Sequence, residues 1–105
     1  MMDNRQIDVL DIRLAETLDI SITQELHSEL RSALDSGVPV SLHGSAVERV
    51  DTAALQLLVA MFIYADGHKY RLEWQSPSEA LIRSAALLGV DRHIGLTNKN
   101  SFSNH

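Results

Sequence analysis

The change from a strand-like to a helix-like pattern at residues 50–55 constrains this chain more than any other feature. The sequence there is Val-Asp-Thr-Ala-Ala-Leu, and the apolar run over residues 53–65 is interrupted only by Gln56. Because the first backbone N–H groups of a helix lack intrahelical partners, Asp51 and Thr52 are suitable capping residues. An anion on the Thr52 hydroxyl would also lie at the positive end of the helix dipole. The pattern predicts a helix over residues 52–65 and leaves two interpretations of Thr52 open, a simple cap and a phosphate acceptor.

Strand-like and helix-like segments alternate along the rest of the chain. Strand periodicity occurs in residues 7–14 with a break near Leu10 and Asp11, in residues 38–43, and in the fully alternating residues 70–75. One helix is predicted from a capping box at Ser21 and Gln24 to Gly37. Another is predicted from a Ser76 cap, with Pro77 and Glu79 in its first turn, to Gly89. We expect a further helical turn in residues 90–96 and a frayed tail over residues 97–105. The alternation predicts a single α/β domain over residues 1–105.

The helix over residues 52–65 is apolar on almost every side. Leu55, Leu58, Val59, Phe62 and Ile63 can cover one face, whereas Leu57, Met61 and Tyr64 point elsewhere. A surface helix needs only one apolar stripe, so this composition indicates either deep burial or a second contact surface. Met61 and Tyr64 are the leading candidates for an exposed contact, and self-association into a homodimer is one use that such a surface could have.

Composition excludes several classes of function. The chain has 105 residues, 45% of them apolar, a formal net charge of -5 and no cysteine. The acidic balance disfavours nucleic acid, and disulfides and thiolate metal sites are excluded. The five histidines show no metal-ligand spacing, no phosphate-binding glycine motif occurs, and no set of catalytic groups can be assembled. We therefore expect a protein-binding domain without enzymatic activity, cofactor or metal.

The ends of the chain and its apolar runs bear on its location. The first residues lack the charged and then apolar pattern of a secretory signal, and no apolar run is long enough to cross a bilayer. The cytoplasm is the expected location.

Residues 47–58 resemble the signature of the STAS domain, in which a strand ends in Asp followed by Ser or Thr, two small residues and a Leu-rich helix. Residues 14–19 also resemble the early strand and turn of that family. The chain departs from the usual pattern in two ways, because Thr52 replaces the commoner Ser and Ala53-Ala54 replace Ser-Gly or Gly-Gly. The resemblance implies a small mixed sheet of about four strands with helices covering one face.

The same resemblance implies a function as an anti-sigma factor antagonist whose phosphoacceptor is Thr52. The partner would be an anti-sigma factor with a serine/threonine kinase fold, and a phosphatase would reset the switch. Two alternatives remain open. Residues 50–58 and 87–91 also resemble the STAS subunit that docks on the ATPase of a phospholipid-trafficking ABC transporter, and a STAS adaptor in a chemotaxis or two-component pathway is the third. The expected partner-binding residues are shared by all three: Asp51, Thr52, Ala53, Gln56, Leu57, Met61 and Tyr64.

Overall fold

The computed structural model describes residues 9–96 of the chain. Three parallel strands, β1 (Leu10–Arg13), β3 (Val40–His43) and β5 (Leu72–Gln75), form a sheet in the order β1-β3-β5. Two short strands, β2 (Thr17–Leu18) and β4 (Arg49–Val50), pair with each other in parallel. The expected strand at Ile7 and the expected frayed tail over residues 97–105 lie outside the described residues.

The α/β class predicted from the sequence is confirmed, but the sheet differs in detail from the expected mixed sheet of about four strands. Every strand pairing within residues 9–96 is parallel, and the strands divide into groups of three and two. The division has a local cause. Irregular backbone at residues 14–16 and 44–48 turns the chain away from β1 and β3 before β2 and β4 begin.

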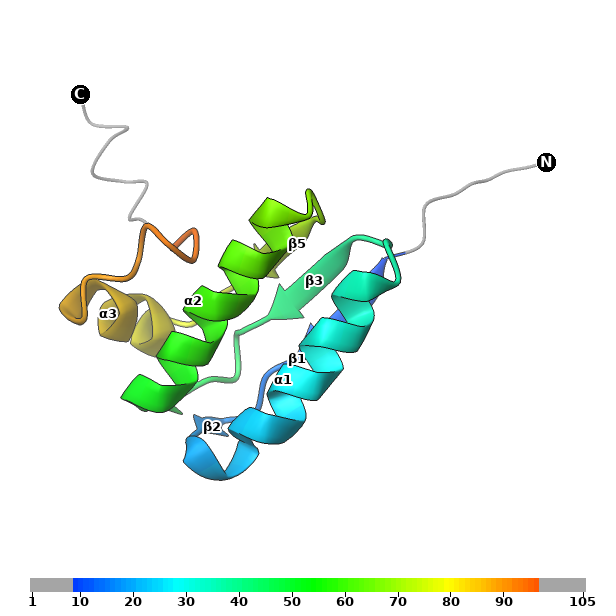
Figure 1. The fold of residues 1–105 in the computed structure, drawn as a ribbon. Helices are drawn as coiled ribbons and strands as arrows, with labels where there is room; N and C mark the ends of the chain where they lie inside the picture. Colours follow the sequence, from blue (N-terminus) through cyan, green and yellow to red (C-terminus); the bar gives the residue numbers. More distant parts are fainter. Residues whose placement is uncertain (1–8, 97–105) are drawn as a thin grey trace.

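The register of the sheet separates an apolar face from a polar one. Leu10, Val40 and Leu72 form one row across the three strands, and Ile12, Leu42 and Trp74 form another. Since side chains alternate along a strand, both rows point to the same face. Figure 1 shows α1 (Ile20–Asp35) and α2 (Thr52–Gly67) lying over one face of this sheet. The helices and the apolar rows enclose the core, and the opposite face carries Asp11, Arg13, Ser41, His43, Glu73 and Gln75.

Two helices begin at residues other than those predicted. The N-cap of α1 is Asp19 rather than Ser21, because the Asp19 carboxylate accepts the Ser21 backbone N–H at 3.0 Å. The N-cap of α3 (Glu79–Leu87) is Ser78 rather than Ser76. Ser76 has a φ of 51° and belongs to the turn that leaves β5, so it cannot occupy the extended cap position. The predicted end of α1 at Gly37 is confirmed, where a φ of 82° favours glycine.

The segment after α3 forms turns rather than the expected additional turn of helix. Its Ile94 is buried, and the Ile94 carbonyl accepts a hydrogen bond from Trp74 Nε1 at 2.6 Å. The Trp74 ring also stacks on Phe62, with ring centroids 5.9 Å apart. Trp74 therefore packs against the core. The turn segment closes the end of the core next to β5.

Leucines on the inner faces of the helices contribute a large part of the core. Leu26, Leu30 and Leu34 of α1 are spaced four residues apart and are all buried, which explains why this helix lies flat on the sheet. Leu88, the C-cap residue of α3, is 48% exposed. None of the helices within residues 9–96 is both long and apolar enough to cross a membrane.

Gly44 provides a test of this packing. A Cβ atom at Gly44 would lie 3.1 Å from Trp74 Cζ3, 3.2 Å from Leu81 Cδ2 and 3.3 Å from Pro77 Cα. We expect Gly44→Ala to lower the free energy of unfolding by about 1–3 kcal/mol through overpacking, as measured by urea denaturation. Gly67→Ala is the matched control, since a Cβ there has no neighbour within 4 Å. Equal stability of the two variants would contradict the tight junction at Gly44.

Candidate functional site

Thr52 is the first residue of α2, directly after the cap residue Asp51. The Asp51 backbone is extended, with a φ of -94° and a ψ of 173°, and its carboxylate accepts the Ala54 N–H at 3.1 Å. This interaction satisfies one of the free N–H groups at the helix start, and the Thr52 side chain is exposed to solvent. The sequence-based expectation that these two residues begin the helix is confirmed. The hydroxyl of Thr52 is accessible at the positive end of the helix dipole.

The start of α1 lies beside the start of α2 because β2 and β4 pair in register. Leu18 is the strand partner of Val50, and the Asp51 N–H donates to the Leu18 carbonyl at 3.0 Å. Each strand is followed by an aspartate cap, so Asp19 and Asp51 occupy equivalent positions. Hydrogen bonds from the Ser21 hydroxyl and then from its backbone N–H lower the pKa of Asp19 below its ordinary value. The site therefore contains two adjacent helix starts, each capped by a carboxylate.

The residue after each cap is exposed. Ile20, which follows Asp19, is 72% exposed, although it is a large apolar residue. It occupies in α1 the position that Thr52 occupies in α2. Sequence reasoning did not select Ile20 as a site residue. The repeated pattern of an apolar residue, Asp and a helix start at residues 18–20 and 50–52 is the signal that would have found it.

The outer face of α2 continues from Thr52 along the helix. Its exposed residues follow helical spacing: Thr52, Gln56, Ala60 and Ile63. Ile63 is 58% exposed, whereas Met61 is only 4% exposed and belongs to the core. The expected roles of these two residues were thus reversed, and the prediction that Met61 is an exposed contact is wrong. Ala53 and Leu57 are half-buried beside the outer face.

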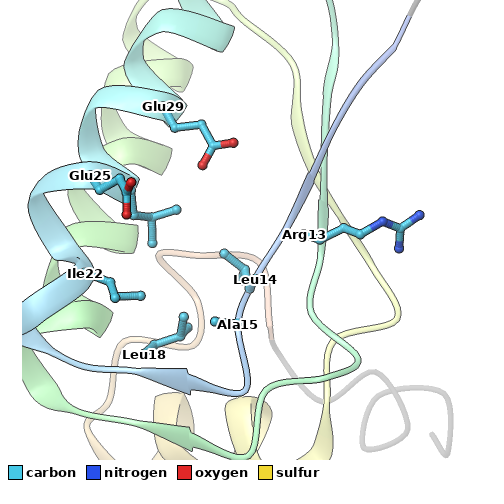
Figure 2. A pocket seen from close by; sticks show the side chains of 8 residues that line it. Arg13, Leu14, Ala15, Leu18, Ile22, Glu25 and Glu29 are labelled. Carbon is cyan, nitrogen blue, oxygen red and sulfur yellow. The ribbon is translucent and has the colours of Figure 1, made fainter.

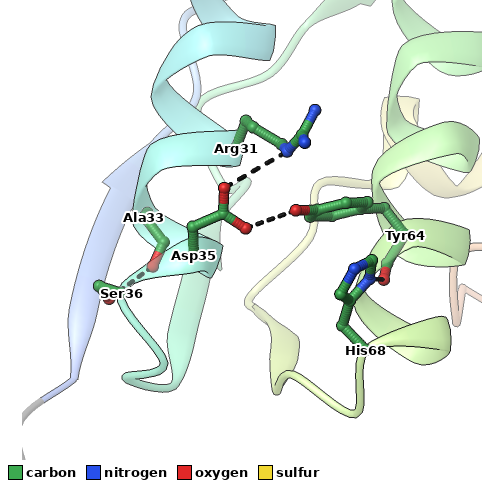
Figure 3. A network of polar contacts seen from close by, with 6 residues as sticks. All are labelled: Arg31, Ala33, Asp35, Ser36, Tyr64 and His68. Atoms are coloured by element: carbon green, nitrogen blue, oxygen red, sulfur yellow. Dashed lines mark hydrogen bonds and ion pairs between the residues drawn. The ribbon is translucent and has the colours of Figure 1, made fainter.

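Tyr64 is half-buried and takes part in an interaction between the two long helices, as Figure 3 shows. The Tyr64 hydroxyl donates to Asp35 Oδ1 at 2.5 Å, and the Arg31 guanidinium lies 4.3 Å from the centre of the Tyr64 ring. Arg31 also pairs with Asp35 at 3.4 Å. The hydrogen bond to Asp35 raises the pKa of Tyr64 above its ordinary value. Tyr64 therefore joins α1 to α2, so its hydroxyl is already engaged within the chain.

A small cavity lies between α1 and the segment that runs from β1 to β2. It measures about 160 Å³ and is lined by residues of α1, β1, the loop into β2 and β2 itself, with an apolar floor and the carboxylates of Glu25 and Glu29 at its rim (Figure 2). Figure 2 shows Arg13 directed away from these carboxylates. On the polar face of the sheet, His43 Nε2 lies 2.7 Å from Asp11 Oδ1. Within residues 9–96, no group of three or more His, Cys, Asp or Glu side chains is placed to hold a metal ion.

Comparison with known proteins identifies the family. The model of the Mlab STAS domain family matches residues 1–98, and the chain belongs to this family. The fold is similar to that of the anti-sigma factor antagonist SpoIIAA in its unphosphorylated form, with a TM-score of 0.65 and 15% sequence identity. The match covers 91% of this chain and 96% of SpoIIAA. No curated protein matches the chain by sequence. The STAS resemblance found at residues 47–58 is confirmed, and so is the small α/β STAS fold, although the strands within residues 9–96 pair only in parallel, as groups of three and two.

The cap of α2 gives a prediction that does not depend on any partner. We expect Asp51→Ala to lower the free energy of unfolding by about 1 kcal/mol, because the Ala54 N–H loses its acceptor. Asp51→Asn should retain most of the stability, since an asparagine oxygen can accept the same hydrogen bond. Asp66→Ala removes a carboxylate from the other end of α2 and should be neutral or slightly stabilising. Urea denaturation checks all three, and a loss for Asp66→Ala as large as for Asp51→Ala would contradict the cap assignment.

Proposed function

We propose that this protein is a non-catalytic binding domain that docks on a partner protein through the start of α2 and its outer face, and that phosphorylation of Thr52 switches the docking off. One observation carries the proposal: an exposed hydroxyl at the first position of a helix that presents exposed apolar side chains farther along the same face. The contact surface consists of Asp51, Thr52, Ala53, Gln56, Leu57, Ala60 and Ile63. Of the residues expected from the sequence, Met61 is left out because it is buried, and Tyr64 is left out because its hydroxyl bonds Asp35 within the chain.

The start of α2 can accept a phosphate without loss of the fold. A phosphate adds about -1.5 to -2 charges at pH 7, and negative charge at a helix start is favourable to the helix. The Asp51 carboxylate is held by the Ala54 N–H and need not move. Phosphorylation is therefore expected to leave the domain folded, so that its effect falls on the bound partner.

The same phosphate would weaken a complex that covers Thr52. Docking would remove a doubly charged group from water, and the nearby carboxylates of Asp51 and Asp19 add like charge to the same end of the molecule. The exposed Ile63 lies on the same helix face and needs an apolar surface on the partner. A partner shaped for this apolar face would lose affinity once Thr52 carries the phosphate.

The comparisons support a regulatory partner. SpoIIAA is described as an anti-sigma factor antagonist, and the matching structure is of its unphosphorylated form. By analogy, the partner of this chain would be an anti-sigma factor with a serine/threonine kinase fold, and a phosphatase would restore the unmodified Thr52. In this arrangement the chain is the substrate of the kinase and contributes no catalytic group of its own.

A second candidate function is permanent docking on the ATPase of a phospholipid-trafficking ABC transporter. The observation that favours it is the exposure of Ile20 and Ile63, since large apolar side chains on a surface are typical of an interface that stays covered. In that case the Thr52 hydroxyl would contribute a contact within the interface rather than a phosphorylation site.

Two substitutions at Thr52 separate these functions. In a pull-down and in a titration with the purified partner, Thr52→Glu should remain folded and bind at least about tenfold more weakly, because desolvation of an unpaired charge costs more than 1.4 kcal/mol. Thr52→Val keeps the side-chain shape without the hydroxyl, so it should bind and then resist release by a kinase and ATP. Ala86→Glu adds the same charge to an exposed residue of α3 and is the control.

The outcomes differ for the two functions. Release of the wild-type chain by kinase and ATP, with retention of Thr52→Val, supports the switch. Release of both proteins to the same extent contradicts Thr52 as the phosphoacceptor. Binding of an ATPase subunit that never depends on phosphorylation supports the structural role instead.

A further inference from the structure

The strand β5 has an open edge. It pairs with β3 on one side, and no other strand within the described part of the chain pairs with its second side. The Arg71 carbonyl accepts from the Val40 N–H at 2.9 Å, and the Gln75 carbonyl accepts from the Gly44 N–H at 3.2 Å. Because backbone groups alternate along a strand, those of Leu72 and Trp74 point away from β3. These groups form a short template for another strand.

The side chains along this edge are complementary to those of a second, antiparallel copy. If the two strands meet with Leu72 opposite its own counterpart, Arg71 lies opposite the partner's Glu73, and Tyr70 lies opposite the partner's Trp74. Arg71 and Glu73 are 71% and 65% exposed and form an ion pair with each other at 3.9 Å, and in the dimer each would also face the opposite charge of the second copy. Opposite charges and aromatic pairs placed directly across two antiparallel strands both stabilise the pairing.

We propose that two copies of this protein associate through antiparallel pairing of β5, centred on Leu72. The two Leu72 residues then exchange both backbone hydrogen bonds, and each Trp74 N–H donates to the carbonyl of Tyr70 of the partner subunit. The Tyr70 N–H is already bonded to the Ala65 carbonyl at 2.8 Å and takes no part. Half-buried Tyr70, Leu72 and Trp74 lie on the helix side of the sheet, so the pairing extends the covered apolar face across the two copies.

Other registers are disfavoured by charge and by backbone geometry. If the pair were centred on Glu73, the two Glu73 carboxylates would lie opposite each other. The backbone groups that would have to face the partner are also those already bonded to β3. Centring it on Trp74 would pair Leu72 with the partner's Ser76, whose φ of 51° bends the chain out of the strand. A shift that matches odd with even residues places the polar side chains of one copy against the apolar side chains of the other. Only the register centred on Leu72 meets all three conditions.

This pairing leaves the surface around Thr52 free. None of the residues of the proposed partner-binding surface belongs to β5 or to its edge. A dimer formed in this way therefore presents two copies of that surface, and the dimer can be tested independently of the phosphorylation switch.

Charge reversal tests the proposal on the full chain. Sedimentation velocity over a range of concentrations should show a reversible monomer–dimer equilibrium for the wild type. Arg71→Glu and Glu73→Arg each place like charges opposite one another twice in the dimer, so each should raise the dissociation constant about tenfold or more. An equimolar mixture of these two variants restores opposite charges at every contact and should regain the dimer. Circular dichroism establishes that each variant is folded.

Glu79→Arg and Arg83→Glu are the controls, because they reverse an exposed ion pair on α3 and should leave the dissociation constant unchanged. Amide exchange provides a second measurement, in which protection of the Leu72 and Trp74 N–H groups rises with protein concentration. A wild type that stays monomeric throughout would overturn the proposal. The same conclusion would follow if the controls weakened association as strongly as the β5 variants, or if the mixture failed to reassociate.

Discussion

The parallel pairing of β2 with β4 is the constraint on which the candidate site depends. Each strand has only two residues, yet the pairing of Leu18 with Val50 holds the starts of both long helices side by side. Leu18 is 1% exposed, so its packing in the core also fixes the position of β2. Without this pairing, the Asp51 N–H would lose its hydrogen-bond acceptor, the Leu18 carbonyl. Thr52 would then lie at the end of an unsupported loop. The exposed start of α2 is therefore positioned by the buried Leu18.

The opposite end of α2 is held by a different interaction. Tyr64 donates to Asp35 of α1, while Arg31 pairs with Asp35 and lies over the Tyr64 ring. The Tyr64 hydroxyl is protonated near neutral pH and so can donate, and its hydrogen bond to Asp35 raises its pKa further. Because α2 is fixed at both ends, a phosphate at Thr52 has little freedom to reorient the helix. The proposed switch thus acts through the charge at the contact surface and needs no change of fold.

Sequence reasoning located the α/β class, the main helices and the Asp51-Thr52 junction, because these depend on local periodicity and capping chemistry. It placed two caps wrongly, since Ser21 and Ser76 each lie two residues from the side chain that caps the helix, and only the course of the preceding strand distinguishes them. It also predicted that Met61 is exposed and that Ile63 covers the core, whereas the structure shows the reverse. Apolar residues lie on almost every side of α2, so its sequence alone cannot show which side faces the core. The packing of α2 against α1 decides it.

The apolar residues that remain exposed follow from the architecture. A three-stranded sheet with helices on one face has only one apolar layer to fill, and its second face is occupied by polar side chains such as Asp11 and His43. The most exposed of the large apolar side chains, Ile20, Ile63 and Leu87, lie on the helices, and Val9 and Leu10 are less exposed at the start of β1. Contacts of the helices with other proteins can therefore use apolar side chains, whereas a contact through the β5 edge uses backbone groups and the charges of Arg71 and Glu73. The proposed surface around Thr52 and the proposed pairing of β5 correspond to these two kinds of contact.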